Sequence, residues 1–170
     1  MDIGTGGGYV AFEWARRNPA VSVIGLDIVE PAITANNRKA RENNCRNLRF
    51  MSFTGMSFPF PNAFFHGSVS RYAFHHFPPP DLAAGEIHRI LEPTGYCVIS
   101  DPKADDGDAI DFVNQFAGLR NDGHVRYYRE SVLTGLFEKA GLFEEKKFSA
   151  PSRFPVRWMS GMNGYWHGRI

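Results

Sequence analysis

The chain of 170 residues has few of the features that mark disulfide-stapled, membrane-spanning or nucleic-acid-binding proteins. Cys45 and Cys97 are its only cysteines, too few for a disulfide framework or a cysteine metal cluster. No apolar run reaches the roughly 18 residues that a membrane-spanning helix needs. The formal net charge of +1 gives no electrostatic attraction to nucleic acid or an anionic membrane. Asp2 and several glycines stand where a signal peptide would be basic and then apolar. The composition favours a cytoplasmic protein of one domain.

What the sequence does contain is a regular alternation of strand-like and helix-like segments. Short apolar runs bounded by turn formers alternate with segments whose apolar residues recur at helical spacing. Strands are expected at residues 21–27, 48–53, 67–74 and 95–101, with a weaker one at 142–149. Helices are expected at residues 9–18, 30–43, 81–91, 109–119 and 130–140. This alternation predicts an α/β fold with a mostly parallel sheet and right-handed crossovers.

A glycine-rich loop opens the chain. An acid and three glycines occupy alternate positions: Asp2, Gly4, Gly6 and Gly8. Such glycines allow a sharp turn and a close approach of a ligand, and the N-terminus of the following helix favours an anionic group. Asp27 ends the next expected strand, where a carboxylate can accept both hydroxyls of a ribose. The alternative is a tight turn with Asp27 capping the next helix. Tyr9 replaces the third glycine of the dinucleotide fingerprint, which disfavours a nicotinamide cofactor.

At these residues the chain resembles the class I S-adenosylmethionine-dependent methyltransferases. It is most similar to the methyltransferase type 11 group, which includes the ubiquinone/menaquinone biosynthesis C-methyltransferases. Five further stretches resemble the family in the same order: FPFPNAFF at 58–65, SRYAFHHF at 70–77, EIHRILEPTGYCVISDP at 86–102, HVRYY at 124–128 and LFEKAGL at 136–142. The resemblance implies a Rossmann-like, doubly wound sheet with helices on both faces, and S-adenosylmethionine as the cofactor.

The resemblance also implies which residues contact the cofactor. Its methionine end would be surrounded by Asp2, Gly4, Thr5, Gly6 and Gly8. Asp27 would bind the ribose, and Ile28 would lie against the adenine. The adenine edge would be contacted by Thr54, Gly55 and Met56. Arg71 is either a cofactor contact or a surface charge.

The sequence departs from the family mainly at its two ends. Members usually have a helical segment and a whole first strand before the loop, whereas only residues 1–3 precede it here. Because that strand would be central, its shortening predicts unpaired backbone groups on its neighbours and a gap in the core. The C-terminus also stops before the family's last strands. We therefore expect a domain truncated at both ends.

Two adjacent histidines, His75 and His76, are the candidate catalytic residues. They follow the expected strand 67–74 at its carboxyl end, where ligands bind in open α/β sheets. Histidine suits a general base if the acceptor must lose a proton. Alternatively, the pair only caps backbone carbonyls before the following prolines. Candidate residues for the acceptor pocket lie on a later loop: His124, Arg126 and Tyr127. A metal site is not expected, because no spacing of His, Cys and Asp matches a known one.

Two functional hypotheses follow from these observations. The first is an S-adenosylmethionine-dependent methyltransferase acting on a small molecule. The second is an inactive or weakly active methyltransferase-like fragment that serves as a binding or interaction module. Residues 1–150 would form the cofactor-binding core and residues 151–170 a C-terminal lid or tail. Neither nucleic acid nor a membrane is an expected partner. The phenylalanine-rich middle forms either an aromatic wall for an apolar acceptor or ordinary core packing.

Overall fold

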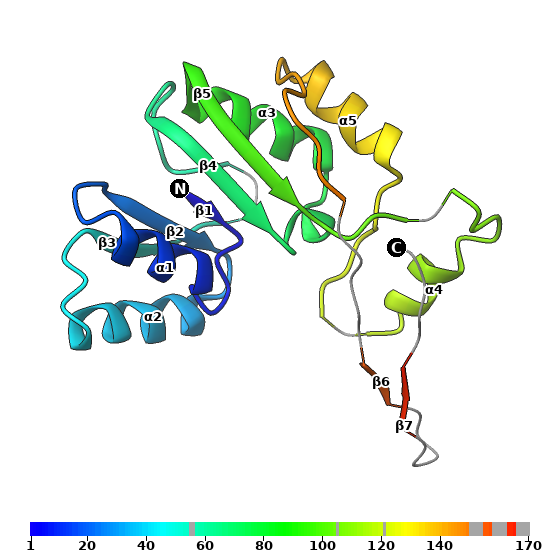
Figure 1. Cartoon of the computed structure of the whole chain (residues 1–170), viewed down its shortest axis with the longest axis horizontal. Coiled ribbons are helices and arrows are strands. Elements are labelled where there is room, and N and C mark those ends of the chain that lie inside the picture. Colours follow the sequence, from blue (N-terminus) through cyan, green and yellow to red (C-terminus); the bar gives the residue numbers. More distant parts are fainter. Residues whose placement is uncertain (55–56, 105, 121, 150–154, 158–162, 166–170) are drawn as a thin grey trace.

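A computed structural model describes residues 1–54, 57–104, 106–120, 122–149, 155–157 and 163–165. Strands alternate with helices along the chain (Figure 1). The strands are β1 (Asp2–Ile3), β2 (Val23–Asp27), β3 (Leu48–Ser52), β4 (Phe65–Arg71), β5 (Leu91–Ser100), β6 (Pro155–Arg157) and β7 (Asn163–Tyr165). The helices are α1 (Tyr9–Arg17), α2 (Glu30–Glu42), α3 (Pro80–Ile90), α4 (Phe112–Ala117) and α5 (Glu130–Lys139), with a short 3₁₀ turn, η1 (Phe74–His76).

Five parallel strands form the main sheet, in the order β3-β2-β1-β4-β5. Although β1 has two residues, it is central, because Asp2 pairs with Gly25 of β2 and with Val69 of β4. The pairing extends to Met1, whose ammonium donates to the carbonyl of Gly67 at 2.8 Å and whose carbonyl accepts the amide of Val69 at 2.8 Å. The short first strand therefore bridges its two neighbours.

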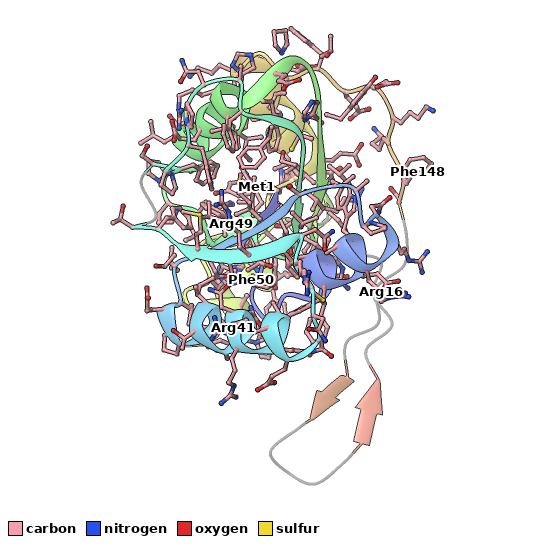
Figure 2. All side chains as sticks on the ribbon, turned by 90° about the vertical axis from the view of Figure 1, so that its left-hand side faces the viewer. Met1, Arg16, Arg41, Arg49, Phe50 and Phe148 are labelled. Carbon is pink, nitrogen blue, oxygen red and sulfur yellow. The ribbon has the colours of Figure 1, made fainter. Side chains whose placement is uncertain are left out.

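Two hydrophobic clusters lie on opposite faces of the sheet. One lies against α1 and α2 and includes Ile33 and Phe50. The other lies against α3 and α5 and includes Phe74 and Ile87. Figure 2 shows Phe50 of β3 pointing toward α2, with Arg49 on the other side of the strand. Right-handed crossovers explain this arrangement, because the chain moves one way from β1 to β3 and the opposite way from β4 to β5. The doubly wound fold is confirmed.

The phenylalanine-rich middle of the chain packs mainly as core. Between residues 50 and 77, five rings expose 8% or less of their surface: Phe50, Phe58, Phe60, Phe65 and Phe74. Phe60 and Phe65 meet edge to face with centroids 4.9 Å apart, a favourable arrangement for aromatic rings. Of the two interpretations of this segment, core packing holds for these five rings.

The strand expected at 95–101 begins four residues earlier, because β5 runs from Leu91 to Ser100. Two other expected elements are cut short at a left-handed residue. The strand expected at 67–74 ends at Arg71, because Tyr72 has a φ of 53° and the chain then turns into η1. The helix expected at 109–119 begins only at Phe112, because Asp111 has a φ of 55°. Left-handed backbone is compatible with neither a strand nor a right-handed helix, so β4 ends before Tyr72 and α4 begins after Asp111.

The expected strand at 142–149 is wrong. These residues form no strand, and Phe143 and Phe148 are 80% and 88% exposed. Within the expected lid or tail, β6 and β7 pair antiparallel, and its other residues lie outside the described part of the chain. No helix among the described residues is long and apolar enough to cross a membrane.

Candidate functional site

The loop between β1 and α1 uses backbone conformations that favour glycine. Gly4, Gly6 and Gly8 have φ values of 68°, 49° and 76°, all in the left-handed region. The amides of Gly4 and Thr5 donate to the carbonyl of Leu26 at 2.8 and 3.0 Å, which ties the loop to β2. A Cβ on Gly6 would meet no atom within 4 Å, so the loop is open to a ligand at this position.

Asp27, at the end of β2, holds the same loop from the other side. Its Oδ2 accepts the amide of Gly6 at 2.7 Å and its Oδ1 accepts the amide of Val29 at 3.0 Å. Asn36 of α2 donates from Nδ2 to the carbonyl of Gly6 at 2.8 Å. A carboxylate has about four acceptor positions, so Asp27 can still accept hydroxyl donors. The adjacent Ile28 is 62% exposed and offers an apolar surface beside the carboxylate.

Asp2 faces the interior and fastens the loop to α1. Its Oδ2 accepts the hydroxyl of Thr5 at 2.7 Å and the amide of Ala11 at 3.1 Å. Burial raises the pKa of the Asp2 carboxyl, while the two hydrogen bonds oppose that shift. Asp2 therefore shapes the loop, and its contact with the cofactor stays a prediction.

Of the other residues expected at the cofactor, the structure describes Thr54 and Arg71. Thr54 is exposed shortly after β3, whereas Gly55 and Met56 lie outside the described residues. Arg71 ends β4, and its guanidinium carbon lies 4.7 Å from the centroid of the Tyr72 ring. Arg71 also borders an open hollow of about 460 Å³ beside α1. Its role as a cofactor contact or a surface charge stays open.

The second part of the site lies where η1 follows β4. His75 is buried in this turn, and its Nδ1 lies 2.9 and 3.1 Å from the two carboxylate oxygens of Asp101, the residue after β5. The backbone amide of His75 donates to Oδ2 of the same carboxylate at 3.0 Å. Its carbonyl accepts the amides of Val125 and Arg126 at 3.0 and 3.1 Å. Three segments of the chain therefore meet at His75.

Aromatic rings surround His75. Its centroid lies 4.1 Å from that of His76, 4.8 Å from Tyr127 and 5.4 Å from His124. The Nδ1 atom of His76 is buried and has no hydrogen-bond partner among the described residues. Burial lowers the pKa of His124, as do the neighbouring His75 and His76. Burial likewise raises the pKa of Tyr127. His124 and Tyr127 are therefore uncharged rings near neutral pH.

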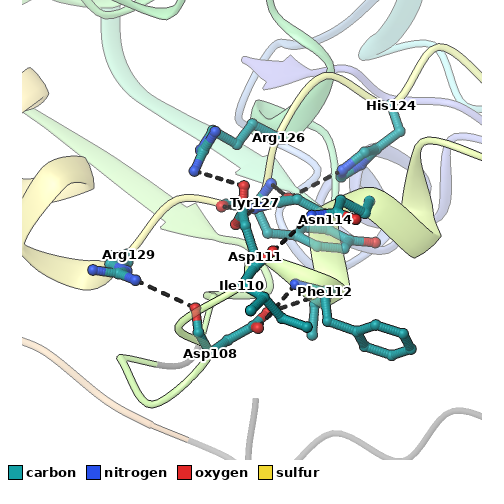
Figure 3. Close-up of polar contacts among 11 residues, drawn as sticks. Asp108, Ile110, Asp111, Phe112, Asn114, His124, Arg126, Tyr127 and Arg129 are labelled. Carbon is teal, nitrogen blue, oxygen red and sulfur yellow. Dashed lines mark hydrogen bonds and ion pairs between the residues drawn. The ribbon is translucent and has the colours of Figure 1, made fainter.

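Figure 3 shows how α4 is joined to the loop at residues 124–128, which carries His124 and Tyr127. Asn114 accepts the amide of Tyr127 at Oδ1 over 2.6 Å and donates from Nδ2 to the carbonyl of Tyr127 over 3.1 Å. The same Oδ1 lies 3.3 Å from Nε2 of His124. Arg126 forms an ion pair of 2.9 Å with Asp111. The amide side chain of Asn114 and the ion pair of Asp111 thus join α4 and the residue before it to this loop.

The structure brings together most of the residues predicted for the acceptor side. His75, His76, His124 and Tyr127 form one cluster. Arg126 instead turns to Asp111. Within the described ranges, no three His, Cys, Asp or Glu side chains are placed to hold a metal ion.

Two residues that hold this cluster, Asp101 and Asn114, were not predicted from the sequence. Asp101 had a usable signal, because it ends the expected strand 95–101 and the carboxyl ends of parallel strands meet at one edge. Asn114 had none, since it lies within a helical pattern and is distinguished only by its contacts with Tyr127.

Comparison with known proteins decides the family to which this arrangement belongs. A family described as a methyltransferase domain matches residues 1–143. The chain belongs to this methyltransferase family. Membership confirms the resemblance to class I methyltransferases and the Rossmann-like fold, and S-adenosylmethionine is the cofactor.

Individual relatives agree with the family assignment. The uncharacterized methyltransferase YcgJ of Bacillus subtilis is 34% identical over 128 residues, which cover 74% of this chain and 49% of YcgJ. The demethylmenaquinone methyltransferase of Thermus thermophilus is 30% identical over 99 residues, 58% of this chain and 44% of that protein. The chain spans about half the length of these curated relatives.

Solved structures show the same likeness in the fold. The crystal structure of YcgJ has a TM-score of 0.79 at 31% identity, covering 90% of this chain and 66% of YcgJ. A putative methyltransferase from Bacillus halodurans has a TM-score of 0.81 at 28% identity, covering 91% of this chain and 66% of that one.

The residues around the glycine loop fit this cofactor. The open space at Gly6 gives room for a ligand against the backbone. Asp2 accepts the amide of Ala11, but no acceptor for the amides of Tyr9 and Val10 is present among the described residues, so these two first-turn amides are available to an anionic group such as a carboxylate. Asp27 supplies acceptors for ribose hydroxyls, and exposed Ile28 supplies a surface for a base.

Proposed function

We propose that the chain transfers the methyl group of S-adenosylmethionine to a small-molecule acceptor, as an enzyme of the EC 2.1.1 class. The observation that carries the proposal is that the glycine loop touches the acceptor-side turn. A Cβ on Gly4 would overlap the Cβ of Ala73, the residue before η1. An acceptor held at the ring cluster would therefore lie next to a cofactor held by the loop.

Two relatives support a small-molecule acceptor. One is the demethylmenaquinone methyltransferase of Thermus thermophilus. Another is the fatty-acid O-methyltransferase of Mycolicibacterium smegmatis, 28% identical over 103 residues, 61% of this chain and 36% of that protein. Both act on small molecules by name, and the open hollow and loops described above suit a ligand of that size. The proposal extends to a cytoplasmic location, without nucleic acid or a membrane as partner.

The cofactor, when bound, supplies a methyl group already activated on a sulfonium. The chain mainly has to hold the two reactants in line, which is a proximity effect. In the proposal Asp27 accepts the ribose hydroxyls, and Ile28 covers one face of the adenine. The amides of the first turn of α1 bind the methionine carboxylate. The adenine edge would lie near Thr54, Gly55 and Met56.

On the acceptor side, His75 and His76 are the proposed proton acceptors. Asp101 favours His75 for this role, because the carboxylate holds the ring in one orientation. His124, Arg126 and Tyr127 would line the acceptor pocket. Arg126 would act there through its ion pair with Asp111, which fixes the loop.

Binding calorimetry with S-adenosylhomocysteine, NAD and ATP tests the cofactor assignment. We expect S-adenosylhomocysteine alone to bind. Asp27→Asn should weaken that binding about 10- to 100-fold, because charged hydrogen bonds are worth about 1.5–3 kcal/mol. Glu30→Gln is the matched control, since it removes a nearby exposed carboxylate in the first turn of α2 and should change little.

The outcomes separate the two functional hypotheses. Absence of binding to all three ligands would contradict the proposed function. Binding of S-adenosylhomocysteine without methyl transfer to any acceptor favours the alternative, a binding module that keeps the fold. Equal affinities of wild type and Asp27→Asn would refute the ribose assignment.

A further inference from the structure

We propose that Asp101 and His75 act as a pair that takes the proton from a phenol- or enol-type hydroxyl of the acceptor, with Asp101 as the positioning residue. This inference rests on the proposed methyl transfer and adds the class of acceptor to it. In the proposal His75 meets the acceptor through its second ring nitrogen, Nε2. Asp101 touches only His75 and acts through it.

The contacts of Asp101 determine which ring nitrogen of His75 carries the proton. The side chains of Asp101 and His75 are both buried, 3% and 7% exposed. The Asp101 oxygens lie 2.9 and 3.1 Å from Nδ1, and Oδ2 also accepts the backbone amide of His75. A carboxylate only accepts, so Nδ1 must be the protonated nitrogen. In the neutral imidazole of His75, Nε2 then carries the free lone pair.

The surroundings of His75 leave that lone pair for the acceptor. The ring is packed by three other rings, those of His76, His124 and Tyr127. The carboxylate of Asp101 faces it as well. No hydrogen-bond partner of Nε2 is present in the part of the chain that the structure describes. If Asp101 served only to join η1 to the end of β5, its hydrogen bond with the backbone amide of His75 would be sufficient. Its carboxylate also contacts Nδ1 of the ring.

The chemistry of methyl acceptors narrows the class that needs such a pair. A carboxylic acid, with a pKa near 4, is already ionised at neutral pH, whereas a phenol with a pKa near 10 is not. Neutral amines are nucleophilic without losing a proton first. Arg126 is paired with Asp111 at 2.9 Å, so its positive charge is already balanced by a carboxylate. The neutral rings of His124 and Tyr127 suit a planar, uncharged acceptor.

The proposed step balances as a single displacement. The hydroxyl proton moves to Nε2 of His75, and the oxygen's electron pair forms the bond to the methyl carbon. The carbon–sulfur bond breaks with its pair going to sulfur. The products are the methyl ether, S-adenosylhomocysteine and an imidazolium whose charge Asp101 balances. The proton then leaves to solvent.

The first test reads the tautomer directly. Ring nitrogens of His75 are observed by ¹⁵N-correlated NMR in the wild-type chain, where we expect Nδ1 protonated and Nε2 free. In Asp101→Asn, the side-chain oxygen of the asparagine accepts the backbone amide of His75, so the NH₂ group of the asparagine faces Nδ1. We therefore expect the other tautomer, with the proton on Nε2. Glu92→Gln is the matched control, because it removes the carboxylate of an exposed histidine–acid contact, His66 to Glu92 at 3.5 Å. A protonated Nε2 in the wild type would overturn the proposal without any variant.

The second test uses methyl transfer to two probes, catechol and 4-nitrophenol. General bases contribute about 10²–10⁴-fold, so Asp101→Asn should lower kcat for catechol about 100-fold or more. S-adenosylhomocysteine affinity should stay within about threefold. The ratio of wild-type to variant rates should shrink as the pH rises from about 7 to about 9.5, because the phenol then ionises by itself. The same ratio should be far smaller for 4-nitrophenol, a more acidic phenol of which about half is already ionised near neutral pH.

The outcomes distinguish this inference from the proposed function. Loss of transfer that does not recover at high pH, and that is equal for both probes, would indicate a purely structural Asp101 and overturn the inference. Absence of transfer to both probes would overturn the acceptor class. Failure of the wild-type chain to bind S-adenosylhomocysteine would instead count against the proposed function, and the NMR measurement would still decide the histidine–aspartate pair.

Discussion

The cofactor side and the acceptor side of the sheet edge are assembled in different ways. On the cofactor side, the glycine loop, Asp27 and Asn36 all come from residues 1–52, and each is hydrogen-bonded to its neighbours. The acceptor side joins three distant segments, which meet at His75, and leaves Nδ1 of His76 buried without a partner in the described ranges.

The difference indicates which part is set by local chain geometry. The cofactor side follows from a few glycines and one acid at short spacing. The acceptor side forms only when β5 and the loop at 124–128 have reached η1. Loops on a rigid scaffold usually carry specificity, so the identity of the acceptor depends on the second side. Substitutions on the two sides should therefore have separable effects.

The largest effect is expected where the two sides touch, at Gly4. Alanine there would keep a φ of 68° and place its Cβ onto the Cβ of Ala73. Left-handed backbone costs a non-glycine residue about 1–2 kcal/mol, and overpacking costs about 1–3 kcal/mol. We expect Gly4→Ala to lower the free energy of unfolding by about 2–5 kcal/mol in urea denaturation. It should also abolish S-adenosylhomocysteine binding.

Gly6→Ala separates backbone strain from contact. Gly6 has a φ of 49°, but a Cβ there would meet no atom within 4 Å. Its cost should therefore be limited to strain, about 1–2 kcal/mol. Equal losses in the two variants would show that the contact with Ala73 does not join the two sides energetically.

The next effect should be confined to the acceptor side. Asn114→Ala removes the partners of both backbone groups of Tyr127 and should cost about 1–3 kcal/mol locally. Hydrogen exchange at residues 124–128 should then rise, and methyl transfer should fall about tenfold with cofactor affinity unchanged. Gln115→Ala, which removes an exposed contact on the same helix, is the control. A parallel loss of cofactor affinity would contradict the separation of the two sides.

The cofactor side and the acceptor side also differ in how much of each could be predicted from the sequence. The loop and Asp27 were predicted with their positions, because their spacing alone carries the geometry. The position of His75 was predicted but its partner was not, since Asp101 lies 26 residues away. The end of β4 was misplaced because Tyr72 turns left-handed where its amide bonds to the carbonyl of Ser100, a tertiary contact.

The prediction of a strand at 142–149 was wrong for a related reason. Weak alternation of polar and apolar residues predicts a strand, but a strand also needs an edge with which to pair. The edge strand β5 pairs with β4, and residues 142–149 pair with neither. Alternation without a partner therefore indicates only an extended segment.

A smaller effect is expected at Glu86 of α3, which holds the segment between β3 and β4. Glu86 accepts the amide of Phe58 at 2.7 Å and is paired with Arg89 of the same helix. The hydrogen bonds from Arg89 lower the pKa of Glu86 to about 2. This stabilisation is present above the ordinary pKa of about 4.5 and is lost as the pH falls toward 2.

Glu86→Gln should therefore lower the free energy of unfolding by about 1–2 kcal/mol at neutral pH. The difference from wild type should shrink as the pH falls from about 4.5 toward 2, in acid denaturation followed by circular dichroism. Glu13→Gln, at an exposed acid paired with Arg16 and Arg17, serves as the control and should be nearly neutral. A difference that stays constant with pH would mean that charge is not the source of the stabilisation.

The smallest effect is expected at Arg71, which ends β4 between the two sides. Its guanidinium lies over the ring of Tyr72, and an exposed contact of this kind is worth about 0.5–1 kcal/mol. If Arg71 is only a surface charge, Arg71→Ala should change S-adenosylhomocysteine affinity less than about threefold, with no change in salt dependence. Arg71→Lys keeps the charge and separates it from the stacking. A tenfold loss that is restored by lysine would instead place Arg71 at the cofactor, and the boundary of the cofactor side would then extend from the glycine loop to β4.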